Sequence, residues 1–273
     1  MSLLTPEQHP VKYYSSKDAD APQISDADLV IKTIIKACLV TGYGAKAGAG
    51  WTALHEDANK IVLRRPLQTG NPVDVKIING YGLHQIVSQD NPSSINDAAF
   101  LAKTNMIARD ASCGTEWHLI ASDFGFLFCY QMGYKSNSEK NNIMYVGSMS
   151  PLRDTGSPML MLKNNKAATN GTADYGVHEL LGTGVSFIDM RSGAELTDKQ
   201  YVSISLYPDK EFVQKLIIHS YFTPFYISVA SYSNDKTTET VTIKGRPMLR
   251  WMNKMDRDTN SRALFIPLDY WEL

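Results

Sequence analysis

The sequence predicts an α+β protein with an N-terminal helix, mixed but mainly antiparallel β-sheets and a β-rich C-terminal half. Three observations predict this class. One early segment has apolar residues at helical spacing, several later segments alternate apolar and polar residues as strands do, and 43% of residues are hydrophobic, enough for a packed core. We expect an extended arm over residues 1–24, an α+β lobe over 25–112 and a β-rich lobe over 113–273, with the two lobes compatible with one domain.

Residues 1–24 are expected to be extended and not to form a packed element. Pro6, Pro10 and Pro22 interrupt any regular helix in this segment. Tyr13 and Tyr14 place two large rings side by side in a polar stretch, and such rings need an apolar surface. We therefore expect the arm to contact a neighbouring subunit through these tyrosines.

A helix is predicted over residues 26–41. Ser25 is a suitable N-cap, and Gly42 is a natural residue to end the helix. An apolar stripe of one helical face is formed by Ile31, Ile34, Ile35, Cys38 and Leu39, with Lys32 and Lys36 expected on the opposite face.

The glycine-rich stretch 42–51 after this helix does not predict a nucleotide site. It lacks the Gly-Lys-Ser/Thr ending of a phosphate-binding loop, and a dinucleotide fingerprint would have to follow a strand. We interpret it as a connector whose backbone turns and approaches its neighbours closely, with Trp51 as a core anchor.

Strands are predicted from alternation and β-branched content, and the strongest signal is an antiparallel hairpin over 116–132 with its turn at 122–125 and Trp117 in the core. A short helix is predicted over 97–104, capped by Asn96, and polar loops over 135–142 and 164–184. The tail, 246–273, is expected to be packed because it contains Trp251 and Trp271. The further predicted strands are 60–65, 73–78, 141–146, 185–190, 201–207, 216–220, 226–231 and 238–244.

The titratable residues show no catalytic or metal-binding spacing. The six histidines are scattered, and His118 and His219 are interpreted as structural residues within strands. A glycosidase-like carboxylate pair remains an alternative, with Asp123, Asp189 and Glu195 as candidates. We expect no cofactor and no metal, and we expect Cys38, Cys113 and Cys129 to be free thiols.

Charge excludes some partners and suggests one surface. Lys and Arg number 27 against 28 Asp and Glu, which argues against a specific nucleic-acid partner. Basic residues gather only near the C-terminus, where Arg246, Arg250 and Arg257 are candidate interface residues for an acidic partner protein or a phosphate. No signal peptide precedes the helix, and 29–40 is too short to span a bilayer, so we expect a soluble chain made in the cytoplasm.

Several short pieces of the chain follow one another in a recognisable order. The N-terminal pieces are Tyr13-Tyr14-Ser15-Ser16, Asp20-Ala21-Pro22-Gln23-Ile24-Ser25, Ala37-Cys38-Leu39-Val40-Thr41-Gly42-Tyr43-Gly44, Ala49-Gly50-Trp51-Thr52 and Asn59-Lys60-Ile61-Val62-Leu63-Arg64. In this order they resemble a family of virion structural proteins of tailed bacteriophages. Further along the chain, 117–126 resembles that family's Trp-containing hairpin, and 142–151 its following strand with a turn at Gly147. The chain departs from the pattern at Ala21-Pro22, which lacks a preceding Gly, and near Gly80, which lacks an Arg-Gly-Tyr-Glu run.

The resemblance, which covers about residues 11–165, implies a non-enzymatic part of a virion. It implies a tail or baseplate protein that is made in the bacterial host cytoplasm and assembles as a symmetric oligomer with copies of itself and other virion proteins, with no membrane or small-molecule partner. A place in the neck or capsid is the alternative within this class. Outside it stand a receptor- or glycan-binding module that would use exposed aromatics such as Tyr232, and a phage-encoded enzyme.

Overall fold

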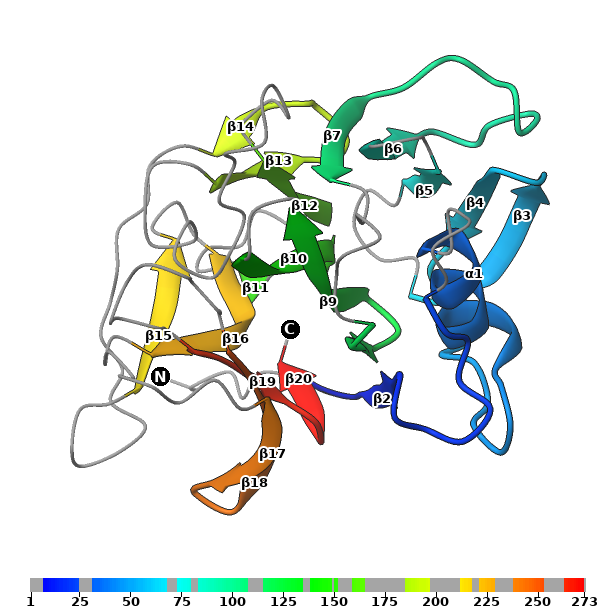
Figure 1. Cartoon of the computed structure of the whole chain (residues 1–273). Helices are drawn as coiled ribbons and strands as arrows, with labels where there is room; N and C mark the ends of the chain where they lie inside the picture. Colours follow the sequence, from blue (N-terminus) through cyan, green and yellow to red (C-terminus); the bar gives the residue numbers. More distant parts are fainter. Residues whose placement is uncertain are drawn as a thin grey trace.

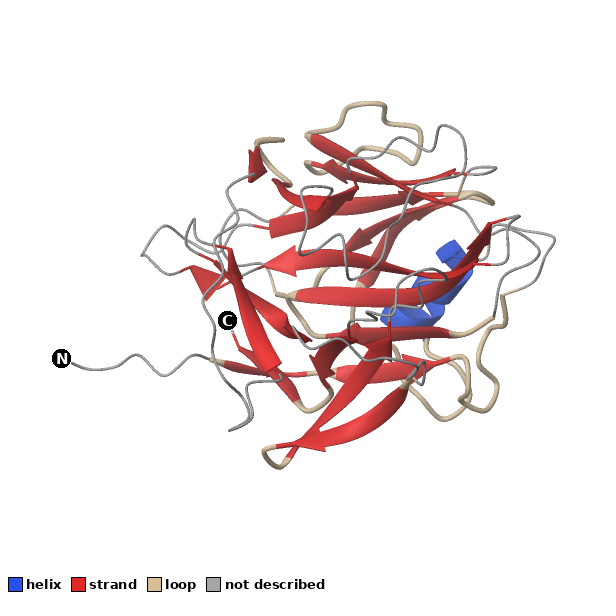
Figure 2. Cartoon of the chain, turned by 60° about the vertical axis from the view of Figure 1, so that its left-hand side comes forward, coloured by secondary structure: helices blue, strands red, loops and turns tan. Residues whose placement is uncertain are grey.

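The chain folds into three stacked layers of antiparallel β-sheet with a single described helix at one side (Figure 1). Figure 2 shows how strands dominate the part of the chain described by the computed structural model. Every described strand pairing is antiparallel, which confirms the predicted class of an N-terminal helix followed by antiparallel sheets. The structure describes residues 7–24, 31–67, 73–79, 83–107, 115–134, 138–148, 150–151, 159–164, 185–196, 212–217, 221–228, 238–252 and 263–272.

The middle layer is a seven-stranded sheet built around the predicted hairpin. Its strands, in spatial order, are β14 (Glu195–Leu196), β13 (Val185–Asp189), β12 (Met159–Asn164), β10 (Ser138–Ser148), β9 (Gly125–Tyr134), β8 (Trp117–Ala121) and β2 (Lys12–Ser15). The hairpin of β8 and β9 is confirmed, and so are the strands expected over 141–146 and 185–190.

Two smaller sheets cover the faces of the middle layer, and a two-stranded pair joins the two ends of the described chain. The five-stranded sheet contains β3 (Thr52–Glu56), β4 (Lys60–Arg64), β5 (Asp74–Ile78), β6 (Leu83–Gln89) and β7 (Ala102–Ile107). The six-stranded sheet runs β11 (Ser150–Pro151), β16 (Tyr221–Ser228), β19 (Ala263–Pro267), β18 (Arg246–Met252), β17 (Glu239–Ile243), with β15 (Phe212–Ile217) also paired to β16. The pair is β1 (Gln8–Pro10) with β20 (Tyr270–Glu272).

The middle sheet is buried on both faces because successive residues of a strand point in opposite directions. On β8, Leu119 belongs to the core shared with the helix and the five-stranded sheet, whereas Ile120 belongs to the core shared with the six-stranded sheet. Trp51 and Trp117 lie in the first core, and Trp251 and Trp271 in the second, all at most 2% exposed. Their predicted burial is confirmed.

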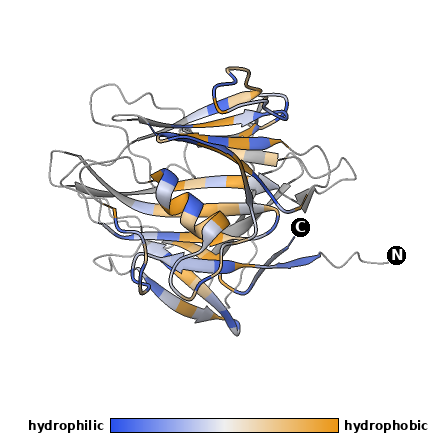
Figure 3. Cartoon of the chain, turned by 90° about the vertical axis from the view of Figure 1, so that its right-hand side faces the viewer, coloured by the Kyte–Doolittle hydropathy of each residue, from blue (hydrophilic) through white to orange (hydrophobic). Residues whose placement is uncertain are grey.

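In the described part of the chain, the helix consists of α1 (Ile31–Lys36) followed by one π-helical turn, η1 (Ala37–Thr41). The expected N-cap Ser25 and the expected first turn lie outside the described residues. All five residues of the predicted stripe are buried. Gly42 ends the turn as predicted, with φ at +76°, and its N–H donates to the carbonyl of Ala37 at 2.8 Å. Figure 3 shows the helix lying across the strands, with hydrophobic and hydrophilic residues alternating along it.

Lys32, expected on the solvent face, is only 8% exposed. The end of β3 covers this face, and the Lys32 ammonium reaches Glu56 at 2.9 Å. The two members of this ion pair come from elements 24 residues apart, so the periodicity of the helix alone could not predict the contact.

The predicted helix over 97–104 is wrong, because residues 97–101 form a connection and Ala102 begins β7. Backbone groups that a helix would use are bound to side chains instead. The Asp97 carboxylate accepts from the N–H of Ala99 at 3.0 Å, and the Gln89 amide donates to the carbonyls of Asp97 and Ala99 at 2.9 and 2.7 Å.

Three further boundaries differ from the prediction. The polar loop expected over 135–142 belongs to β10 from Ser138 onward, and Gly147, expected in a turn, lies within β10 opposite Gly125. The strand expected over 216–220 corresponds to β15, which spans Phe212–Ile217. The strand expected over 226–231 corresponds to β16, which spans Tyr221–Ser228. Pro224 lies within β16, opposite a register shift in β15 between Gln214 and Leu216. The strand expected over 201–207 and the loop after residue 164 lie outside the described residues.

Candidate functional site

The segment expected to be a free arm is packed against the body of the chain from residue 7 onward. β1 pairs with β20, and β2 forms the outer strand of the middle sheet beside β8. Tyr14 is 1% exposed and lies in the first core, so its ring is buried within its own chain. The reason for expecting Tyr14 at a subunit contact is therefore removed, whereas Tyr13 is partly exposed and its interface role stays a prediction.

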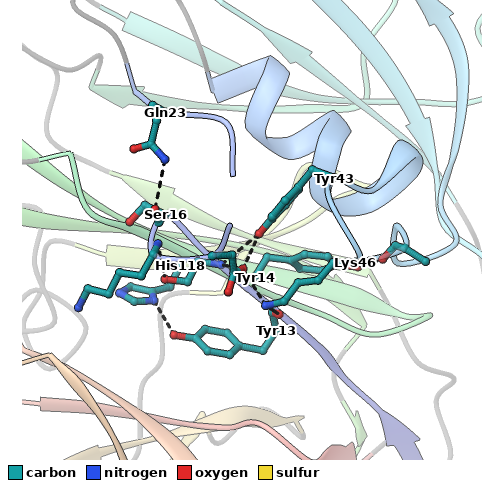
Figure 4. A network of polar contacts seen from close by, with 11 residues as sticks. Tyr13, Tyr14, Ser16, Gln23, Tyr43, Lys46 and His118 are labelled. Carbon is teal, nitrogen blue, oxygen red and sulfur yellow. Dashed lines mark hydrogen bonds and ion pairs between the residues drawn. The ribbon is translucent and has the colours of Figure 1, made fainter. Parts of the chain in front are cut away.

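Polar contacts concentrate around β2 (Figure 4). The centre is the Asp18 carboxylate, whose Oδ2 accepts from the Lys46 ammonium at 2.7 Å, the Tyr43 hydroxyl at 2.7 Å and the Ser15 N–H at 2.8 Å. We call Asp18, Tyr43 and Lys46 the edge clamp. Burial alone would raise the pKa of Asp18, but the hydrogen bonds from Lys46 and Tyr43 outweigh it and lower the pKa.

The edge clamp binds backbone groups on the outer side of β2. Lys46 also donates to the carbonyl of Tyr13 at 2.9 Å, while Asp18 accepts from the N–H of Ser15. The Tyr14 hydroxyl donates to the carbonyl of Ala47 at 2.7 Å, and Lys12 donates to that of Gly48 at 2.7 Å. An outer strand normally leaves such groups free to pair with another chain, so these contacts close this edge of the sheet.

The glycine-rich stretch 42–51 supplies Tyr43 and Lys46, two of the three residues of the edge clamp. As predicted, it turns sharply and approaches its neighbours closely, since a Cβ on Gly42 would lie 2.3 Å from the carbonyl oxygen of Lys46. The N–H groups of Ala49 and Trp51 donate to the carbonyls of Cys38 and Leu39 at 2.9 and 3.0 Å. These bonds fix the loop on the end of the helix and place Lys46 beside β2.

A second polar chain runs from Tyr13 through His118 to Glu116. The Tyr13 hydroxyl lies 2.8 Å from Nδ1 of His118, and Nε2 of His118 lies 2.9 Å from the Glu116 carboxylate. Lys17 pairs with the same carboxylate at 2.8 Å. Burial alone would raise the pKa of Glu116, but the contacts with His118 and Lys17 lower it to about 2. An ionised Glu116 accepts, so His118 carries its proton on Nε2 and accepts from Tyr13 at Nδ1.

This order of hydroxyl, imidazole and carboxylate is also the order of a nucleophilic triad, but the electrostatics favour a structural role. Burial raises the pKa of Tyr13 to about 12, whereas an activated nucleophile needs a lowered pKa. Burial also lowers the pKa of His118, although Glu116 opposes this shift. The His118 ring stacks on Tyr13 and meets the edge of Trp251, with centroids 5.9 and 5.3 Å away. His118 lies in strand β8 as predicted, and these contacts support its interpretation as a structural residue.

Of the three arginines predicted to form an interface, Arg246 and Arg250 lie within the described residues, far along the chain from this network, and both are ion-paired. Arg246 binds both carboxylate oxygens of Asp269 at 2.8 and 2.9 Å and lies over the ring of Tyr270. Arg250 pairs with Glu239 at 2.5 Å. Arg257 lies outside the described residues. Arg250 therefore links β18 to β17, and Arg246 links β18 to the bend between β19 and β20.

Two of the three candidate carboxylates have hydrogen-bond partners in the described structure. Asp123 lies 2.8 Å from Nδ1 of His9, and Asp189 accepts from the N–H groups of Arg191 and Ser192, each at 2.8 Å. Glu195 lies on the short strand β14. His219 and Tyr232 lie outside the described residues.

The edge clamp was not identified from the sequence, and neither was Arg65. Arg65 is 2% exposed, donates to Ser148 and to the carbonyl of Phe124, and has a pKa lowered to about 10 by burial. Asp18 and Lys46 are 28 residues apart, and no local pattern links residues at that separation. The only sequence signal was the glycine-rich stretch itself, which predicted close approach without naming the partner.

Comparisons of the chain with family models, curated proteins and solved structures find no match. Within the described residues, no group of three or more His, Cys, Asp and Glu side chains could hold a metal ion. No helix in that part of the chain is long and apolar enough to cross a membrane. Cys38 and Cys129 are free and buried, and Cys113 lies outside the description.

Proposed function

We propose that this chain is a non-enzymatic structural component of a tailed bacteriophage virion. Its place is the tail or baseplate, where it assembles into a symmetric oligomer with copies of itself and other virion proteins; the neck or capsid is the alternative position. The observation that carries this proposal is that three of the sequence pieces resembling the virion family, at β2, in the 42–51 stretch and in the hairpin of β8 and β9, are joined by hydrogen bonds.

The contacts between these pieces support the proposal because they connect segments far apart in sequence. The Trp117 indole donates to the carbonyl of Pro22 at 3.0 Å, and the Ser16 N–H donates to the carbonyl of Trp117 at 3.0 Å. Trp51 donates from its indole to the carbonyl of Ser122 at 3.2 Å. The residues that carry the resemblance thus hold the fold together, as expected when a family shares a rigid part instead of a reaction.

The chemistry of the polar network points the same way. Within the edge clamp and the Tyr13–His118–Glu116 chain, each group described above donates to or accepts from a neighbour, and burial raises the pKa of Tyr13. A fully bonded network of this kind fixes one conformation of a core. Rigid subunits suit an assembly because little conformational freedom is lost when many copies dock.

The test is the composition of intact particles. Mass spectrometry of gradient-purified virions of the encoding phage should detect this chain in a fixed ratio to the major tail protein. A replication protein of the same phage serves as the control that should be absent. Gold-labelled antibody against the chain should then mark the tail or baseplate in micrographs. A chain that is missing from purified virions, yet abundant in infected cells, would contradict the proposal.

A further inference from the structure

β17 is the outer strand of the six-stranded sheet, and unlike β2 it has an open edge. The hairpin of β17 and β18 extends away from the rest of the molecule at the bottom of Figure 1. Thr240 and Thr242 are exposed, and Val241 between them is partly exposed. The chain therefore presents a short run of β-forming residues at an accessible edge.

The hairpin geometry shows which backbone groups face outward. The turn residues Lys244 and Gly245 both have positive φ, at 48° and 78°, which is the signature of a two-residue type I′ turn. In such a hairpin the residues flanking the turn, Ile243 and Arg246, exchange both backbone hydrogen bonds, and bonded pairs then alternate along the strands. The N–H and C=O groups of Thr240 and Thr242 consequently point away from β18.

Four other outer strands in the described part of the chain carry features that oppose pairing, whereas β7 (Ala102–Ile107) pairs with β6 in regular register. The edge clamp binds β2, and β3 has a bulge between Ala53 and His55. β11 has only two residues, one of them Pro151, and β15 has a register shift. β17 has five consecutive pairs in regular register, contains no proline, and bears β-branched residues at four of five positions. Such an edge is a template for another strand.

We propose that β17 pairs antiparallel with β17 of a second copy of this chain, with the two-fold axis passing through Val241. This register lets Thr240 and Thr242 of one copy exchange backbone hydrogen bonds with Thr242 and Thr240 of the other. Val241 then faces Val241 across a non-hydrogen-bonded position, where side chains approach most closely. The two six-stranded sheets become one continuous sheet.

Charge selects the antiparallel arrangement. Glu239 begins the strand and Lys244 follows its end. The Glu239 carboxylate pairs with Arg250 of its own chain at 2.5 Å, but its side chain is 46% exposed and stays accessible to a second positive charge. Antiparallel pairing brings the Glu239 end of each copy towards the Lys244 end of the other, whereas parallel pairing would bring like charges together. A second copy is thus electrostatically complementary to this edge in the orientation that a two-fold axis requires.

The pairing takes its biological meaning from the proposed role in assembly, but it is tested on the purified full-length chain. Sedimentation equilibrium should show a concentration-dependent dimer. Val241→Lys and Val241→Glu each place like charges opposite one another on the axis. Each variant alone should therefore have an association constant at least about tenfold lower than that of the wild-type chain. An equimolar mixture of the two should recover association, because Lys then faces Glu.

A cross-link gives a second readout that does not depend on charge. Val241→Cys should form an intermolecular disulfide under mild oxidation, since the axis brings the two cysteines together. Thr240→Cys is the matched control and should not, because its opposite residue is Thr242. Each of four results would overturn the proposal. These are a monomeric wild-type chain, charge variants that dimerise normally on their own, a mixture of the two charge variants that stays dissociated, and equal cross-linking of both cysteine variants. These results are separate from the presence of the chain in virions, which tests the proposed function.

Discussion

The outer strands β2 and β17 differ in whether side chains from other segments bind their outward backbone groups. The backbone of β2 is bound along its outer side by Lys46 and Asp18, which come from loops outside the sheet. The outward groups of Thr240 and Thr242 in β17 face solvent. The difference shows that sheet growth is blocked at β2 by polar side chains from elsewhere in the chain, whereas β17 remains available for another strand.

The two edges also differ in what lies beneath them. Tyr14 on β2 is buried in the first core and meets Tyr43 with ring centroids 5.9 Å apart. β17 has only Ile243 fully buried and contacts the body through β18. Substitutions around β2 should therefore change the stability of the fold, whereas substitutions on the outer side of β17 should change only association.

The largest effect is expected from Trp117→Ala. Trp117 is fully buried next to β2, and its indole holds the segment that follows β2. Removing a buried tryptophan side chain should lower the free energy of unfolding by about 3–5 kcal/mol. Urea denaturation followed by circular dichroism measures this, with Trp117→Phe as a milder control that keeps a ring. An unchanged unfolding midpoint for Trp117→Ala would show that this side chain does not support the edge.

Asp18→Asn should have the next largest effect, because it removes the charge at the centre of the edge clamp. Hydrogen bonds to charged groups contribute about 1.5–3 kcal/mol, and the partial exposure of Lys46 places the expected loss near the lower figure. Amide hydrogen exchange at Ser15 should accelerate in the variant. Asp20→Asn is the matched control, since Asp20 is exposed and has a φ of +60°, which asparagine tolerates. Equal effects of the two substitutions would contradict the role of the edge clamp.

Acid should weaken the β2 side of the molecule through Glu116. Its pKa of about 2 lies below the ordinary value of 4.5, so its stabilising contribution is full above pH 4.5 and is lost as pH falls towards 2. His118, with a lowered pKa, adds a loss in the same direction as pH falls below 6.5. Glu116→Gln should therefore flatten the fall in unfolding free energy between pH 5 and pH 3.

The control for this pH series is Glu7→Gln, which removes a carboxylate whose side chain is 80% exposed. It should keep the wild-type slope of unfolding free energy against pH. If Glu116→Gln shows the same slope as the wild-type chain, Glu116 does not couple protonation to folding.

The smallest effect on folding is expected at the open edge. Val241→Lys should change the free energy of unfolding by less than about 0.5 kcal/mol, because Val241 is only partly buried and its own hairpin bonds are unaffected. The urea midpoint measured at low protein concentration checks this. A loss as large as that of Asp18→Asn would mean that both edges support the fold and that the comparison between them fails.

Much of the fold could be predicted because the signals were local. The stripe from Ile31 to Leu39 and the alternation around Trp117 depend on neighbours within one element, and both were confirmed. The helix expected over 97–104 failed for the opposite reason. Gln89, on another strand, binds the backbone of that segment, and intrinsic helix preference does not include such a competitor.

The polar network around β2 could not be predicted because it depends on contacts between distant segments. Tyr13 and Tyr14 were identified as rings that need burial, but the sequence did not show that Ala47 and His118 would receive their hydroxyls. Arg246 and Arg250 were identified as a basic cluster, and their acidic partners are Asp269, in the bend between β19 and β20, and Glu239, on the neighbouring strand β17. In each case the residue type was recognised and its partner was set by the sheet topology.

The pairing of β1 with β20 has a consequence for the order in which the chain can fold. His9 lies opposite Trp271, and Tyr13 lies opposite Ile120. At about 5–20 residues per second, a ribosome needs several seconds or more after making β2 before β8 exists, and β1 waits until nearly the whole described chain is made. During that interval the first strands have no partner in their own chain. The pairing of β1 with β20 is therefore among the last steps by which the described chain can complete its fold.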